Sequence, residues 1–133
     1  MIYIDSNVLI YAALDPRKKG KWCRSVLRQI ESGKQPALTS SLTFDELVYI
    51  VRRESGLDES LRIGQAALEM SNLYFVPVDD IILLKSIELM RALRLFPRDA
   101  IHAASATNSG VFVIYSEDKD FDKVKELERV WLT

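Results

Sequence analysis

The sequence predicts an α/β protein of three layers, in which a central, mainly parallel sheet of about five strands lies between helices. Three observations carry this prediction. Short apolar runs alternate with longer segments of helical periodicity along the whole chain. The apolar runs are continuous rather than alternating, as in strands buried on both faces. The 133 residues contain no repeat and no linker-like stretch, so residues 1–133 fit a single domain.

Each expected strand is short and ends at a polar residue or a turn. Strands are expected at about residues 2–4, 36–39, 74–78, 111–115 and 130–132, the last at a sheet edge. Helices are expected at about residues 8–13, 22–33, 41–55, 58–71, 79–93 and 98–107. Ligands of open parallel sheets bind at the carboxyl ends of the strands, so polar residues directly after strands are the first candidates for a site.

Composition and charge restrict the class of protein. The formal net charge is -1 and the sequence pI is about 5.9, which argues against a protein held to nucleic acid by bulk positive charge. Cys23 is the only cysteine, so a reducing compartment is expected. No apolar run approaches the roughly 20 residues of a membrane span, and Met1–Asp5 lacks a basic leader. We therefore expect a cytoplasmic protein without a membrane anchor.

Two acidic residues occupy unusual positions in the first half of the chain. Asp5 directly follows the first strand, and although it suits a helix N-cap, Ser6 and Asn7 suit that position equally well. On a helix, Glu46 has apolar neighbours one turn away on either side, so it is expected on or beside a buried stripe. A carboxylate there costs several kcal/mol, on the order of 2 or more, unless an arginine or a metal pairs with it.

Three further acids follow in the second half. Asp99 lies in the first turn of an alanine-rich helix, where it complements the helix dipole. Ala103 and Ala106 lie one and two turns further on, and such small side chains let this face approach the sheet and turn Asp99 inward. Asp118 and Asp120 lie in the polar turn after the strand expected at residues 111–115.

These acids predict a cation site. Four separate segments direct carboxylates to one sheet edge, where they would repel each other unless a cation were bound. Oxygen ligands suit Mg²⁺ or Mn²⁺. His102 is the only histidine, so no cysteine and histidine set for zinc exists, and His102 is interpreted as a packing residue or a minor contact near Asp99.

With these residues the chain resembles the PIN domains, and in particular the VapC-type toxins of prokaryotic toxin–antitoxin pairs. The resemblance spans essentially the whole chain. It rests on four segments in order: residues 2–10, 40–47, 98–106 and 116–121. Ser116 stands where the family more often has threonine.

The resemblance implies both an activity and a site. PIN domains of this kind are metal-dependent ribonucleases, often homodimeric, and the toxins are neutralised by an antitoxin protein. Asp5, Glu46 and Asp99 match the first three acids of the family, while Asp118 and Asp120 both fit the last. The acids would hold Mg²⁺ or Mn²⁺, directly or through water, and Glu46 would bind metal or orient the attacking water. Three polar side chains around the acids would hold the carboxylates in position: Ser6, Asn7 and Ser116.

Several alternatives stay open on the sequence alone. The chain could be an RNA-processing PIN nuclease that is no toxin, or a PIN fold kept only as a binding module. An aspartate after the first strand is also typical of haloacid-dehalogenase enzymes, but Asn7 stands where those have a second aspartate. The basic residues of 17–21 could grip RNA or form a solvated charge run. The apolar helix at residues 79–93 could be deeply buried or form a subunit or antitoxin interface.

Overall fold

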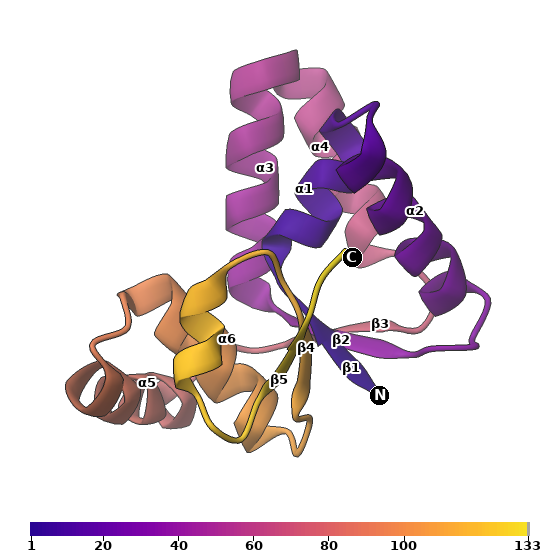
Figure 1. Cartoon of the computed structure of the whole chain (residues 1–133). Helices are drawn as coiled ribbons and strands as arrows, with labels where there is room; N and C mark the ends of the chain where they lie inside the picture. Colours follow the sequence, from indigo (N-terminus) through magenta and orange to yellow (C-terminus); the bar gives the residue numbers. More distant parts are fainter. Residues whose placement is uncertain (133) are drawn as a thin grey trace.

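The computed structural model describes residues 1–132 and has one sheet in which all neighbouring strands are parallel (Figure 1). The strand order is β3-β2-β1-β4-β5. The strands are β1 (Ile2–Ile4), β2 (Ala37–Ser40), β3 (Leu73–Val76), β4 (Val113–Tyr115) and β5 (Glu128–Val130). The predicted five-stranded parallel sheet is therefore confirmed, with β1 at its centre.

Helices cover both faces of this sheet, which confirms the three-layer prediction. In Figure 1, α1 to α4 lie together on one side of the strands, and α5 and α6 lie on the other. The helices are α1 (Ser6–Leu14), α2 (Lys18–Glu31), α3 (Ser41–Ser55), α4 (Leu57–Leu68), α5 (Asp80–Leu93) and α6 (Pro97–Asn108), followed by the short 3-10 helix η1 (Lys119–Lys123). None of the helices within residues 1–132 is long and apolar enough to cross a membrane.

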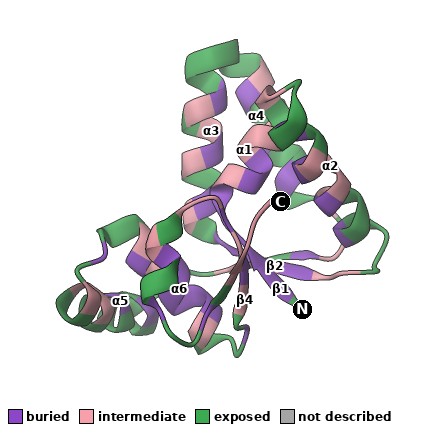
Figure 2. Ribbon diagram, in the orientation of Figure 1, coloured by how far each residue is buried: buried purple, intermediate pink, exposed green. Residues whose placement is uncertain are grey.

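The two faces of the sheet bury separate apolar cores (Figure 2). Successive side chains of a strand point to opposite faces. Ile4 accordingly joins the core beneath α1 to α4, whereas Tyr3 joins the core beneath α6. Ala103 and Ala106 are fully buried in the second core, so the small-residue face of α6 does approach the sheet closely.

One segment differs from the sequence-based expectation, and for another the structure bears on two alternatives that the sequence left open. The basic run is largely helical, because α2 begins at Lys18 rather than near Trp22. Helix α5 is not deeply buried: Ile82 is covered, but Ile81, Leu84 and Ile87 are 59 %, 64 % and 44 % exposed. Periodicity alone could not distinguish these outcomes, because a buried helix and an interface helix carry the same apolar pattern.

The strand register brings the ends of β1 and β4 side by side. Ile4 pairs with Tyr115, and the backbone N–H of the next residue, Asp5, donates to the Tyr115 carbonyl at 3.0 Å. Asp5 and Ser116 thus leave the sheet at neighbouring positions. On the other side of β1, Ser40 ends β2 and caps α3, which carries Glu46.

Candidate functional site

Asp5 lies at the centre of the candidate site and is almost fully buried. It is also the N-cap of α1, since its Oδ1 accepts from the backbone N–H of Ser6 at 2.7 Å. The expectation that Ser6 or Asn7 could take over the cap is therefore wrong: the extended backbone at Asp5 directs its own carboxylate at the first helical turn. The cap occupies mainly Oδ1 and leaves Oδ2 directed toward β4.

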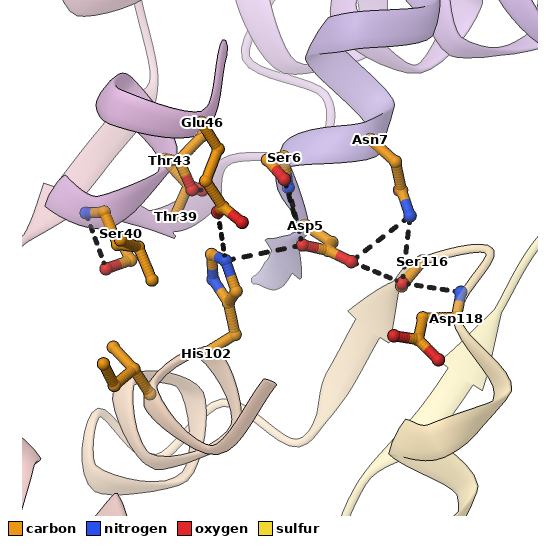
Figure 3. A network of polar contacts seen from close by, with 12 residues as sticks. Asp5, Ser6, Asn7, Thr39, Ser40, Thr43, Glu46, His102, Ser116 and Asp118 are labelled. Atoms are coloured by element: carbon orange, nitrogen blue, oxygen red, sulfur yellow. Dashed lines mark hydrogen bonds and ion pairs between the residues drawn. The ribbon is translucent and has the colours of Figure 1, made fainter. Parts of the chain in front are cut away.

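Ser116 and Asn7 hold the second oxygen of Asp5 (Figure 3). The Ser116 hydroxyl donates to Asp5 Oδ2 at 2.6 Å, and Asn7 Nδ2 donates to the same oxygen at 3.2 Å. Asn7 Nδ2 also lies 3.3 Å from Ser116 Oγ. The side-chain carbonyl Oδ1 of Asn7 is buried without a hydrogen-bond partner in residues 1–132. Such an unpaired acceptor is costly in a folded protein and is consistent with an additional donor or cation at this edge.

Glu46 is joined to α6 by a hydrogen-bonded chain of three side chains. Glu46 Oε1 lies 2.7 Å from Nε2 of His102, and the other ring nitrogen, Nδ1, lies 2.7 Å from the hydroxyl of Tyr3. Because a carboxylate only accepts hydrogen bonds, His102 must carry a proton on Nε2. This bond uses one Glu46 oxygen and leaves Oε2 as the atom that can receive a water or a cation.

His102 therefore does more than the sequence predicted. It is 1 % exposed, and its Nε2 also lies 3.5 Å from Asp5 Oδ1. Burial alone lowers the pKa of His102, but the hydrogen bond to Glu46 and the charge of Asp5 raise it overall. The imidazole thus links two carboxylates that would otherwise face each other unbridged. A sequence signal existed, because His102 follows Asp99 by three residues and so shares its helix face.

Asp99, Asp118 and Asp120 form a second, less buried cluster. One oxygen from each carboxylate lies within 4.8 Å of the others, and Asp5, Glu46 and His102 form a corresponding group deeper in the site. The Ser116 hydroxyl connects the two clusters, since it donates to Asp5 and accepts from the backbone N–H of Asp118 at 3.0 Å. The structure therefore brings together all five acids that the sequence singled out.

The two acids of the last turn differ in their surroundings. Asp118 caps η1 by accepting from the backbone N–H of Asp120 at 2.9 Å, and its carboxylate lies beside Asp99. Asp120 has a side chain that is 46 % exposed and lies 3.5 Å from Lys123 Nζ. Asp118 is therefore the more enclosed of the two acids, and Asp120 lies nearer solvent.

The electrostatics of the second cluster suit a divalent cation. Burial, followed by the hydrogen bond to and negative charge of Asp118, raises the pKa of Asp99 to about 7. Asp5 adds to the same effect. A proton on Asp99 relieves this repulsion, and a cation surrounded by carboxylate oxygens would relieve it more completely. The donor set therefore fits Mg²⁺ or Mn²⁺, which prefer oxygen ligands.

The basic run after α1 is partly used within the fold. Lys19 pairs with Glu117, and its ammonium group lies 5.2 Å from the centre of the Tyr11 ring. Tyr11 in turn donates to Glu117 at 2.6 Å. Lys19 is therefore engaged next to the turn that carries Ser116 and Asp118, while Arg17, Lys18 and Lys21 stay exposed.

Comparison with known proteins agrees with this geometry. The family model described as PIN domain matches residues 2–127. No curated protein matches significantly. The match favours the PIN resemblance over the haloacid-dehalogenase alternative.

Solved structures of low sequence identity share the fold. VapBC2 of Rickettsia felis, bound to a DNA fragment from its promoter, has a TM-score of 0.76 at 17 % identity, covering 98 % of each chain. The sarcin–ricin-loop-cleaving toxin VapC20 of Mycobacterium tuberculosis has a TM-score of 0.74 at 18 % identity, covering 93 % of this chain and 95 % of the other. DNA-bound VapBC of Salmonella typhimurium has a TM-score of 0.75 at 16 % identity, covering 98 % of each chain.

The Tyr3–His102–Glu46 chain makes a prediction for stability. His102→Phe keeps an aromatic ring but leaves the Glu46 carboxylate and the Tyr3 hydroxyl unpaired in a buried region, so the free energy of unfolding should fall by about 3 kcal/mol. Tyr3→Phe removes only the outer bond and should cost about 1 kcal/mol. Urea unfolding followed by circular dichroism measures both. Equal stability of the two variants would contradict the central position given to His102.

Proposed function

The chain belongs to the PIN domain family, and on this basis we propose that it is a metal-dependent endoribonuclease that hydrolyses RNA phosphodiester bonds, as the toxin of a VapBC-type pair. The observation that carries the proposal is the convergence of five acids from four segments at one sheet edge. A scaffold without chemistry has no use for this arrangement, because gathered carboxylates destabilise the fold.

The residues have distinct roles in the proposed reaction. Asp99 and Asp118, with Asp5 behind them, would hold Mg²⁺ or Mn²⁺. When bound, such an ion lowers the pKa of a coordinated water and neutralises charge on the scissile phosphate. Ser116 and Asn7 would keep Asp5 oriented through their hydrogen bonds to Oδ2.

Glu46 would act on the water. His102 fixes its Oε1, so Oε2 would accept a hydrogen bond from the attacking water and orient it toward the phosphorus atom. The water then adds to the phosphorus and releases one of its protons to solvent as the bond to one ester oxygen breaks. The departing oxygen takes up a proton from solvent, so one RNA strand becomes two.

Cleavage of RNA tests the proposal directly. A labelled single-stranded RNA should be cut with Mn²⁺ or Mg²⁺ and left intact with EDTA. Asp99→Asn should lower the rate about 100-fold or more, because one metal-binding carboxylate becomes an amide. Asp58→Asn is the matched control, since Asp58 also lies in the first turn of a helix but is exposed on α4. Its rate should equal that of the parent.

Two failures of this assay have different meanings. No cleavage of any RNA together with no binding of Mn²⁺ by calorimetry would contradict the nuclease and leave a PIN-fold binding module. Cleavage that persists in EDTA, or in Asp99→Asn, would contradict the carboxylate mechanism while leaving an RNA-cleaving protein.

The proposed antitoxin partner draws support from two observations. Two of the similar structures described above are DNA-bound VapBC complexes, and a further similar structure is a toxin–antitoxin complex from Klebsiella pneumoniae. In addition, α1, α2 and α4 enclose an apolar hollow of about 170 Å³. Its lining includes Leu9, Leu27, Ile63 and Met70. A small adjacent open reading frame for a DNA-binding protein would favour the toxin over the alternative, an RNA-processing PIN nuclease.

We also propose that the chain forms a homodimer through α5. The exposed residues Ile81, Leu84 and Ile87 give this helix an apolar outer face, and apolar patches of this kind mark interaction sites.

The dimer makes its own prediction. Leu84→Lys should convert a dimer to a monomer in light scattering without loss of helical content, because Leu84 is 64 % exposed and contributes little to the core. Leu61→Lys on α4, where Leu61 is 52 % exposed, is the matched control and should leave the mass unchanged. A parent protein that is monomeric at all accessible concentrations would contradict the dimer.

A further inference from the structure

Two neighbouring hollows open over the carboxylate clusters. The first, of about 460 Å³, is lined by Glu46, Tyr49 and Arg53 of α3 and by Ser6 of α1. The second lies at the start of α6 and is lined by Phe96, Pro97, Arg98 and Asp99. Arg98 lines both hollows. One acid of each cluster therefore faces a hollow, and Arg98 lies where the two adjoin.

An exposed aromatic ring lies in each hollow. Tyr49 is 64 % exposed and follows Glu46 on α3 by three residues, so it lies on the same helix face. Phe96 is 77 % exposed, the highest exposure among the large hydrophobic residues described, and it precedes Asp99 by three residues. Neither ring contributes much to a core, and both lose free energy by facing water. Their position beside the acids indicates that a ligand covers them.

Positive charges lie beside both rings, next to Asp45 and Glu46 in the first hollow and Asp99 in the second. Arg53 and Arg98 line the hollows, and Arg52 adjoins Tyr49 in a further shallow depression. Within residues 1–132, Arg98 has no ion pair, and the only one of Arg53 is with its exposed neighbour Glu54. Guanidinium groups bind phosphate oxygens in a forked geometry, so these arginines can hold a phosphate backbone on either side of the carboxylates.

From these observations we infer that Tyr49 and Phe96 are the platforms on which bases of the RNA substrate stack beside the carboxylate clusters. The inference rests on the proposed nuclease function and adds the residues that hold the bases of its substrate. Arg53 and Arg98 contact the flanking phosphates. Bases of a duplex stay stacked on each other and cannot lie on protein rings, whereas bases of a loop or single strand can. Tyr49 and Phe96 are therefore the residues through which the site would favour unpaired RNA over duplex.

RNA binding tests this inference separately from cleavage. In the Asp118→Asn background with Mg²⁺, fluorescence anisotropy should show a labelled 12-nucleotide single strand binding at least about 10-fold more tightly than the blunt duplex of the same sequence. Tyr49→Ala and Phe96→Ala should each weaken binding of the single strand about 10-fold. Tyr49→Phe and Phe96→Tyr should bind as the parent does, because a stacking ring remains.

Matched controls use exposed aromatic residues elsewhere on the surface. Tyr74 is 53 % exposed and Phe112 is 48 % exposed, and neither lines the hollows. Tyr74→Ala and Phe112→Ala should leave RNA affinity unchanged. Light scattering on Phe96→Ala measures whether this variant changes the oligomeric state. If the variant dissociates an oligomer, Phe96 is a subunit contact, and its assignment as a base-stacking residue is wrong.

The outcomes separate the inference from the function on which it rests. Equal affinity for duplex and single strand, or unchanged affinity of Tyr49→Ala and Phe96→Ala, overturns the inference even when the parent protein cleaves RNA. Absence of binding to either RNA overturns it as well. Weakened binding in both alanine variants supports it. If the parent protein then cleaves no RNA, the proposed nuclease function is wrong, but the assignment of Tyr49 and Phe96 as base-stacking residues is retained.

Discussion

Repulsion between carboxylates gathered at one edge of a parallel sheet is the constraint on which the rest of this structure depends. Parallel strands all end on the same side, so the residues that follow them meet there. Asp5 follows β1, Asp118 follows β4, and the adjacent helices α3 and α6 contribute Glu46 and Asp99. The topology that gives the protein its sheet thus also concentrates its negative charge.

Several neutral groups make this concentration tolerable within the fold. The Asp5 carboxylate accepts hydrogen bonds from the first backbone N–H of α1, the Ser116 hydroxyl and the Asn7 amide, so both of its oxygens have partners. Glu46 is held by His102, which is itself anchored by Tyr3 in the core beneath α6. Asp99 is in a different position: burial first, and then the hydrogen bond to and charge of Asp118, raise its pKa. Hydrogen bonds within the protein hold Asp5 and Glu46 in place, whereas a bound cation would relieve the repulsion among the outer acids around Asp99.

Much of the fold followed from the sequence because local signals and topology agree. The strand at residues 2–4 and the helix after it were predictable from a short apolar run followed by a cap residue. Asp5, Glu46 and Asp99 could be identified because each stands where burial or strand ends make an acid costly. The choice between Asp118 and Asp120 could not be made, since both lie in one polar turn and differ only in their neighbours in space.

Other features depend on contacts that no local pattern encodes. The bond between His102 and Glu46 joins residues 56 positions apart, and a lone histidine on a helix is ordinarily a packing residue. The sequence left two alternatives open for α5, because Ile81, Leu84 and Ile87 fit a core helix and an interface helix equally well. The exposed rings of Tyr49 and Phe96 acquire meaning only once the hollows around them are known. Side chains that act on a ligand thus stay ambiguous until the fold brings them together.

Stability of the parent protein and of Asp99→Asn at pH 8, with EDTA and with Mn²⁺, tests the central claim most directly. Because the folded-state pKa of Asp99 is about 7, above that of an unfolded aspartate near 3.9, folding favours the protonated acid, and stability is lost as pH rises from about 4 through 7. In EDTA at pH 8 the amide variant should therefore unfold at higher urea than the parent. Mn²⁺ should reverse the order by stabilising only the parent. The account would be contradicted if the parent protein were more stable than Asp99→Asn in EDTA and if Mn²⁺ left the stability of the parent unchanged.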